Sequence, residues 1–170
     1  MVGKILVGVD GSESATEAVD YACCLALQLG MEVVALRVVD KGKYLPGFWH
    51  GIEKTIEKEL ETHAVQTLRE ARKQAQAYNV AIDLEIRYGD SADEICRFVQ
   101  GHPEISLVVL GAGGRGHKDK RVLGYTSEHL AFQVGKKLPC PLLLAPYRGM
   151  SPEAGERHDK WCVLQSQKPE

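Results

Sequence analysis

The chain has 170 residues, of which 44% are hydrophobic and 26% charged, and its formal net charge is −2. This length fits one domain with a buried core, and the balanced charge gives no field that would attract DNA or RNA. No apolar run approaches the roughly 18 residues of a membrane span, and no secretory signal is evident. We therefore expect a cytoplasmic protein that binds neither nucleic acid nor membrane.

Short apolar runs alternate with amphipathic segments along the whole chain. The short runs predict strands, and the segments with apolar positions three or four residues apart predict helices. In chain order we expect a strand over 4–9, a helix over 14–29, a strand over 33–39, a helix over 52–78, a strand over 82–88, a helix over 91–101, a strand over 105–110, a helix over 126–136 and a strand over 139–145.

Two of the expected helices begin with capping-box spacing, in which a serine is followed three residues later by glutamate. Ser14 with Glu17 predicts the start of the first helix, and Ser91 with Glu94 predicts the start of the third. Gly30 suits the left-handed position that commonly ends a helix.

The five cysteines form no C-x-x-C pair, and four of them lie inside apolar patterns. We expect reduced thiols, buried in the core, rather than disulfides or zinc ligands. They are Cys23, Cys24, Cys96, Cys140 and Cys162.

Strands that alternate with helices predict an α/β fold. We expect a three-layer sandwich, with a five-stranded and mostly parallel sheet between layers of helices. Ligands bind such sheets outside the carboxyl ends of the strands, where the strand order reverses. The domain is expected over residues 1–146, and the polar composition of residues 147–170 predicts a flexible tail.

A loop expected over 40–51 holds three aromatic side chains, Tyr44, Phe48 and Trp49. Two interpretations are equally open for them. They cover a bound ligand, or they pack on the long helix that follows.

The strongest local signal is the glycine-rich loop after the fourth strand. Five of the 17 glycines lie between positions 111 and 124, together with four basic residues, Arg115, Lys118, Lys120 and Arg121. Glycines let backbone N–H groups approach a phosphate, and the N-terminus of the helix expected from Thr126 adds positive potential. The alternative interpretation is a mobile surface loop without a ligand.

Two familiar phosphate motifs do not explain this loop. Gly111, Gly113 and Gly116 match G-x-G-x-x-G, but that fingerprint opens a helix at once within a first βαβ unit, and here about ten loop residues intervene. The P-loop pattern G-x-x-x-x-G-K-[ST] is absent from the sequence.

The spacing Gly111-x₂-Gly114-x₉-Gly124 resembles the ATP-binding motif of the universal stress protein family. Residues 5–12, which read Ile-Leu-Val-Gly-Val-Asp-Gly-Ser, are similar to the family's first strand and Asp-Gly-Ser turn. Residues 36–40 and 139–144 look like its second and last strands. The resemblance covers roughly residues 3–146.

This resemblance implies a Rossmann-like, adenine nucleotide alpha hydrolase-like sheet of order 3-2-1-4-5 that binds ATP or AMP, with Mg²⁺ possible beside ATP. Asp10 would meet the adenosine, and the backbone of Val38 would contact adenine. The remaining expected nucleotide-binding residues are Gly111 and Gly114 at the ribose and phosphates, and Arg115, Gly124, Tyr125, Thr126 and Ser127 at the phosphates.

One position departs from the family pattern. The last glycine is usually followed by a serine or threonine that bonds a phosphate, whereas this chain has the larger Tyr125. Thr126 or Ser127 can take that role. For Asp10 the alternative is a turn residue that bonds its own backbone, a common use of Asp before Gly.

Three functions remain in competition. The first is a nucleotide-binding regulatory module of the stress response, with no catalytic residue and no metal site. The second is a homodimeric interaction protein without nucleotide, joined, as the resemblance implies, through Leu142, Leu143 and Leu144 of the last strand at the sheet edge. The third is a slow ATPase, for which only Asp10 offers a general base.

Overall fold

The computed structural model describes residues 2–40, 53–113 and 123–146. The predicted aromatic residues of the loop before the long helix and the predicted tail over 147–170 lie outside these ranges. Strands and helices alternate as expected. They are β1 (Lys4–Gly8), α1 (Glu13–Leu29), β2 (Glu32–Val39), α2 (Glu53–Ala77), β3 (Ile82–Tyr88), α3 (Ser91–Gly101), β4 (Ile105–Gly111), α4 (Tyr125–Ala131) and β5 (Leu142–Ala145).

The five strands form one sheet in the order β3-β2-β1-β4-β5. Every neighbouring pair is parallel, so all carboxyl ends lie at one edge of the sheet. The order reverses between β1 and β4, because the chain extends first toward β3 and then toward β5. The predicted α/β class and strand order are confirmed, and the reversal marks where a ligand is expected.

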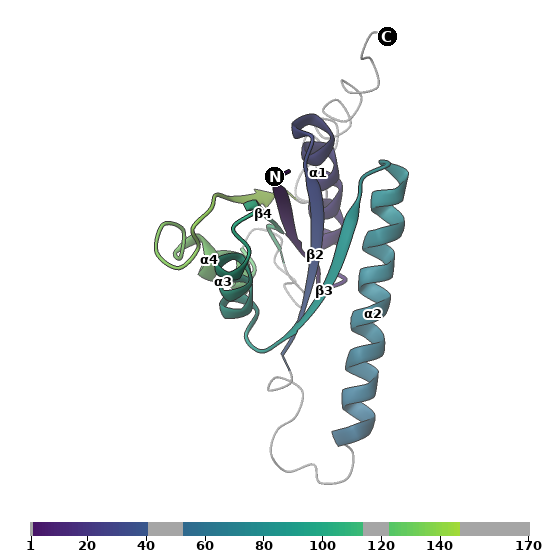
Figure 1. Cartoon of the computed structure of the whole chain (residues 1–170). Coiled ribbons are helices and arrows are strands. Elements are labelled where there is room, and N and C mark those ends of the chain that lie inside the picture. The colour runs from purple at the N-terminus through teal and green to yellow at the C-terminus, as the bar shows by residue number, and fades with distance from the viewer. Residues whose placement is uncertain (1, 41–52, 114–122, 147–170) are drawn as a thin grey trace.

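Helices cover the sheet on both faces, with α1 and α2 on one side and α3 and α4 on the other (Figure 1). The predicted apolar stripe of the long helix α2 is confirmed at Ala64, Leu68, Ala71 and Ala75, which are all buried. Leu68, Ala71 and Ala75 belong to one apolar cluster with residues of α1 and of the sheet. A second cluster, on the opposite face, contains residues of α3 and α4. None of the described helices combines the length and apolarity of a membrane span.

Both predicted capping boxes are wrong, because a neighbouring residue caps each helix. Ser12 accepts a hydrogen bond from the Ala15 N–H at 3.1 Å and begins α1, which leaves Ser14 buried inside the first turn. Asp90 accepts from two N–H groups and begins α3 in place of Ser91. The end of α1 is as predicted, with Gly30 in the left-handed conformation at φ 64°.

The last two elements are shorter than predicted. The helix α4 ends at Ala131 instead of residue 136, because the chain turns back and the Leu138 N–H bonds the Gln133 carbonyl at 3.0 Å. Gly135, at φ 75°, allows this turn. The strand β5 begins at Leu142 instead of residue 139, since the two prolines in 139–141 have no N–H for the ladder.

The four cysteines in the described ranges are buried and unbridged, as predicted. Burial, and to a lesser extent the nearby Asp20 carboxylate, together raise the pKa of the Cys23 thiol to about 12. Burial also raises the pKa of Cys96 and of Cys140. These thiols are therefore core residues that resist ionisation. Cys162 lies outside the described ranges.

Candidate functional site

A cavity of about 250 Å³ opens at the carboxyl ends of β1, β2 and β4, where the strand order reverses. It lies mainly on the side of the sheet that α3 and α4 cover. Its described lining residues are Gly8, Val9, Asp10, Ala15, Leu36, Arg37, Val38, Asp40, Ser91, Ile95, Leu110, Gly111, Gly113, Gly124, Tyr125, Thr126 and Ser127.

One half of the cavity is apolar with two carboxylates beside it. Leu36 and Val38 point to the same face of β2, and Ile95 of α3 belongs to the same apolar cluster. Strand alternation directs the Arg37 side chain to the opposite face, toward the layer of α1 and α2. The carboxylates of Asp10 and Asp40 follow β1 and β2 directly.

Asp10 shapes a turn and also lines the cavity. Its carboxylate oxygen Oδ1 accepts a hydrogen bond from the Ser12 N–H at 2.8 Å, so it shapes its own turn. Gly11, at φ 81°, completes that turn. Asp10 also lines the cavity. The turn therefore fixes where this carboxylate stands relative to any ligand.

The other half of the cavity is formed by glycine backbone and hydroxyl groups. Gly111 ends β4 against the first turn of α1, where a Cβ atom at position 111 would overlap the Ser14 hydroxyl and carbonyl. The Gly113 N–H donates to Ser14 Oγ at 2.9 Å. Gly124 returns the chain to the same place, because its N–H donates to the Ala112 carbonyl at 2.9 Å.

The three residues at the start of α4 have different environments. Ser127 is buried, and its hydroxyl donates to the Gly111 carbonyl at 2.8 Å. Thr126 is half-buried and lines the cavity. Tyr125 is 56% exposed, and its ring lies 5.8 Å from the ring of His129, one turn further along α4. The bulk of Tyr125 is therefore directed largely to solvent, whereas the Ser127 hydroxyl is committed to the backbone.

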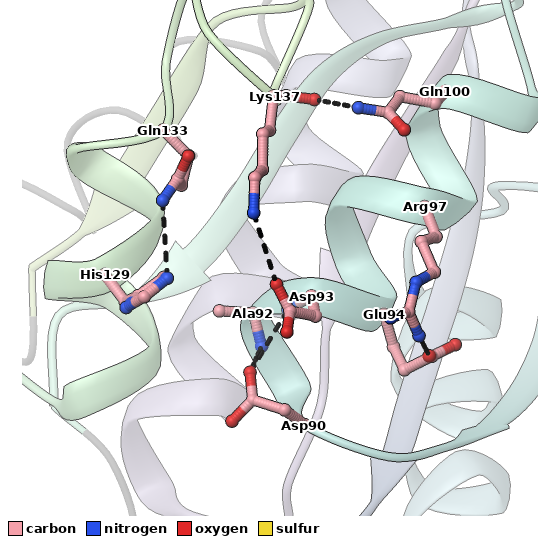
Figure 2. Close-up of polar contacts among 9 residues, drawn as sticks. All are labelled: Asp90, Ala92, Asp93, Glu94, Arg97, Gln100, His129, Gln133 and Lys137. Atoms are coloured by element: carbon pink, nitrogen blue, oxygen red, sulfur yellow. Dashed lines mark hydrogen bonds and ion pairs between the residues drawn. The ribbon is translucent and has the colours of Figure 1, made fainter.

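Polar contacts hold α3 beside the chain segment that follows α4 (Figure 2). The Gln100 side-chain amide donates to the Lys137 carbonyl at 2.7 Å, and the Lys137 ammonium lies 3.9 Å from the Asp93 carboxylate. Figure 2 also shows Asp90 bonded to the first N–H groups of α3. These contacts join α3 to the segment after α4, and residues at the start of both helices line the cavity.

The structure brings together most of the residues predicted for the site. Asp10, Val38, Gly111, Gly124, Tyr125, Thr126 and Ser127 all line the cavity. Gly114 and Arg115 lie outside the described residues. The lining residues that sequence reasoning did not predict include Asp40, Ser91 and Ile95. Asp40 could have been predicted as a lining residue, because it directly follows a predicted strand.

The described part of the cavity has the chemistry of a binding site. An apolar wall suits a flat ring, carboxylates accept hydrogen bonds from hydroxyl or amino groups, and glycine backbone admits a phosphate closely. Within the described ranges, no cluster of three histidine, cysteine, aspartate or glutamate residues could hold a metal ion.

Comparison with known proteins identifies relatives along almost the whole described chain. The model of the universal stress protein family matches residues 1–146. A universal stress protein of Methanocaldococcus jannaschii is 29% identical over 141 residues, which are 83% of this chain and 80% of the relative. The solved structure of a universal stress protein from Lactobacillus plantarum has 26% identity and a TM-score of 0.72, covering 84% of this chain and 97% of the other.

Some solved relatives of lower identity are described with a bound nucleotide. A family protein from Arabidopsis thaliana with AMP bound has 16% identity and a TM-score of 0.57, covering 90% of this chain and 98% of the other. One from Archaeoglobus fulgidus is in complex with dAMP (16% identity, TM-score 0.58, coverage 85% and 97%). Another universal stress protein is in complex with cAMP (20% identity, TM-score 0.58, coverage 86% and 98%).

Proposed function

This chain belongs to the universal stress protein family, and on that premise we propose that it binds an adenine nucleotide in the cavity at the carboxyl ends of β1, β2 and β4. The observation that carries the proposal is the division of this cavity into two chemically different halves. One half is apolar with carboxylates, and the other is glycine backbone with hydroxyl groups.

The apolar half suits the adenosine part of the ligand. Leu36, Val38 and Ile95 offer a surface on which an adenine ring can lie. The carboxylates of Asp10 and Asp40 can accept hydrogen bonds from ribose hydroxyls or from the adenine amino group. The same two negative charges disfavour phosphate in this half, which orients the ligand.

The glycine half suits the phosphates. Gly111 and Gly124 bring backbone from β4 and from the start of α4 to one place, and Thr126 lines the same cavity. The seven residues of α4 make a short helix with a correspondingly small macrodipole. Backbone N–H groups and the Thr126 hydroxyl therefore carry more of the expected phosphate binding than the helix as a whole.

The ligand class is an adenosine phosphate. The glycine spacing of the sequence favours ATP, in which case Mg²⁺ would accompany the phosphates. AMP, dAMP and cAMP occur in solved relatives, and they favour a monophosphate. Tyr125 is compatible with both, because its ring lies against His129 and is largely exposed.

The biological role that follows is a cytoplasmic regulatory module that responds to nucleotide level under stress. Buried thiols such as Cys23 suit a reducing compartment. We propose binding rather than turnover, because Asp10 lies in the half of the cavity proposed for adenosine and not in the half proposed for the phosphates. ATP turnover well above background that disappears in Asp10→Ala would contradict this part of the proposal.

The Thr126→Glu variant tests which half of the cavity takes the phosphates, with Thr126→Gln as the control of equal size. A carboxylate in the first turn of α4 does not destabilise the helix, but it repels a phosphate. We expect Thr126→Glu to weaken ATP and AMP binding by about tenfold relative to Thr126→Gln. Adenosine, which has no phosphate, should bind both variants equally by calorimetry. Equal loss for adenosine and AMP would contradict the assignment of the halves.

A second candidate function is a dimeric interaction protein, and the edge strand β5 supports it. Leu142, Leu143 and Leu144 are each half-buried, and among the described strands β5 has a neighbour on one side only, β4. The opposite edge strand β3 carries Asp83, Glu85 and Arg87 along its length. Charged residues discourage pairing at an edge, whereas three leucines favour it.

Light scattering tests this second candidate directly. A dimer would have twice the 18.7 kDa mass of the chain. We expect Leu143→Lys to give a monomer, because it places a charge on the proposed interface. The control is Phe132→Lys, which changes an apolar residue that is 69% exposed and lies outside β5. A wild-type protein that is monomeric at micromolar concentration would rule out the dimer.

A further inference from the structure

Two buried serines hold the glycine segment that follows β4. Ser14 of α1 accepts a hydrogen bond from the Gly113 N–H at 2.9 Å, and Ser127 of α4 donates one to the Gly111 carbonyl at 2.8 Å. Their exposed fractions are 6% and 4%. The other buried polar residue in the described ranges, Thr67, bonds the His63 carbonyl of its own helix. The two serines differ from it because each bonds a distant segment.

The contact between Ser14 and the glycine segment is close as well as polar. A side chain at Gly111 would overlap both the hydroxyl and the backbone carbonyl of Ser14. The first turn of α1 therefore packs directly on the chain where it leaves β4. Ser14 and Gly113 are 99 residues apart in the sequence, so this contact joins two parts of the cavity that the chain does not connect locally.

The position of Ser14 is itself fixed by the turn that holds Asp10. The Asp10 carboxylate bonds the backbone N–H of Ser12, two residues before Ser14. Ser14 thus stands at a set place relative to the carboxylate in the adenosine half of the cavity. Through Gly113, the same residue reaches the glycine half.

We propose that Ser14 is a positioning residue of the nucleotide site. Its hydroxyl fixes the backbone at Gly113, so that the glycine half of the cavity has its shape before a ligand arrives. The Gly113 N–H is committed to Ser14 and is not a phosphate donor. This inference rests on the proposed nucleotide binding, but the bond that it invokes can be tested separately.

The test compares Ser14→Ala with Ser12→Ala. Both variants remove one hydroxyl from the first turn of α1, but only the first releases the glycine segment. Loss of a hydrogen bond that shapes the site is expected to raise the Kd for ATP or AMP by about tenfold in Ser14→Ala. In Ser12→Ala the thermal midpoint should fall, because the helix loses its cap, while the Kd stays within about twofold of wild type.

Hydrogen exchange at the Gly113 amide provides a readout that does not depend on a ligand. The amide should be protected in wild type and in Ser12→Ala, and should exchange faster in Ser14→Ala. Ser127→Ala, which removes the bond on the other side of the segment, should raise the Kd in the same direction. Unchanged affinity in Ser14→Ala, or an equal loss in Ser12→Ala, would overturn the proposal.

Failure of the proposed function would look different. If wild type binds neither ATP nor AMP, nucleotide binding and the role of Ser14 in it are both wrong. The exchange of the Gly113 amide then still decides whether Ser14 holds the glycine segment. Faster exchange in Ser14→Ala supports that bond, and unchanged exchange contradicts it.

Discussion

The two faces of the sheet are covered very differently. On one face α1 and α2 have 17 and 25 residues, and on the other α3 and α4 have 11 and 7. The long helices α1 and α2 run along the strands (Figure 1). The cavity lies at the carboxyl ends of the strands, where first-turn residues of the shorter helices line it. Both faces carry a buried apolar cluster, and the cavity lies mainly on the face with the shorter helices.

The polar groups of the two faces differ in the same way. Between α1 and α2, Asp20 accepts hydrogen bonds from the Gln74 amide at 2.6 Å and from the Tyr78 hydroxyl at 2.9 Å. This network is satisfied within the protein. On the other face, Asp40 and Thr126 line the cavity, where a ligand can reach them. A change in the network between α1 and α2 should therefore alter stability alone, and a change in a residue that lines the cavity should also alter binding.

The largest expected effect compares one core residue from each face. Leu68 and Ile95 are 4% and 3% exposed, and Ile95 also lines the cavity. Each change to alanine should lower the free energy of unfolding by about 2–5 kcal/mol, measured in urea. Only Ile95→Ala should also raise the Kd for AMP, by about tenfold, because it removes apolar wall. Equal effects of Leu68→Ala and Ile95→Ala on the Kd would contradict the proposed difference between the two faces.

The next effect concerns the contact between β4 and α1. Gly111→Ala forces a methyl group against the Ser14 carbonyl, so we expect a loss of about 1–3 kcal/mol of stability and of most nucleotide binding. Gly101→Ala is the control, because no other described segment comes within 4 Å of a Cβ at that position at the end of α3. The control should keep wild-type binding. Wild-type stability and affinity in Gly111→Ala would contradict the close approach.

A smaller effect is expected in the network between α1 and α2. Tyr78→Phe removes one of the hydrogen bonds to Asp20 and should cost about 1 kcal/mol of unfolding free energy. Because the network lies on the face without the cavity, the Kd for AMP should not change. A shift of the Kd in Tyr78→Phe would show that the two faces are coupled.

The smallest effect lies at the amino ends of the strands, far from the cavity. Hydrogen bonds to Asp83 and then to Glu32 raise the pKa of Lys4 above its ordinary 10.5. A raised lysine pKa stabilises the fold fully below the unfolded value, and the stabilisation is lost as the pH rises through the folded value. Lys4→Met should therefore cost under about 1 kcal/mol at pH 7, since its partners are largely exposed.

For Lys4→Met, the control is a change of salt concentration or pH and not a second variant. The difference in thermal midpoint from wild type should shrink at about 1 M salt and at a pH above the raised pKa of Lys4. A difference that is independent of both salt and pH would mean that Lys4 acts through packing instead of charge.

The sequence predicted the sheet well and the helix ends less well. Ile82–Tyr88 was predicted to the residue, because its alternating pattern is bounded on both sides. Ser14 and Ser91 matched a capping pattern, yet Ser12 and Asp90 are the caps. Local spacing cannot show which of two nearby polar side chains faces the turn, since that depends on how the chain leaves the preceding strand.

Some residues of the candidate site were also predicted from the sequence, and others were missed. Asp10, Val38 and the glycines followed from strand ends and from the family motif. Ile95 was missed because it approaches the cavity only through the packing of α3 on the sheet. The bond between Ser14 and Gly113 joins segments that no local pattern connects, so only the tertiary structure could give it.

The most direct test of the central claim is a calorimetric titration of nucleotide-free protein with ATP and with AMP, after mass spectrometry of any small molecule released on denaturation. We predict micromolar binding of at least one of them, or its recovery from the purified protein. No released nucleotide and no heat at millimolar concentration would contradict the assignment of the cavity as an adenine nucleotide site.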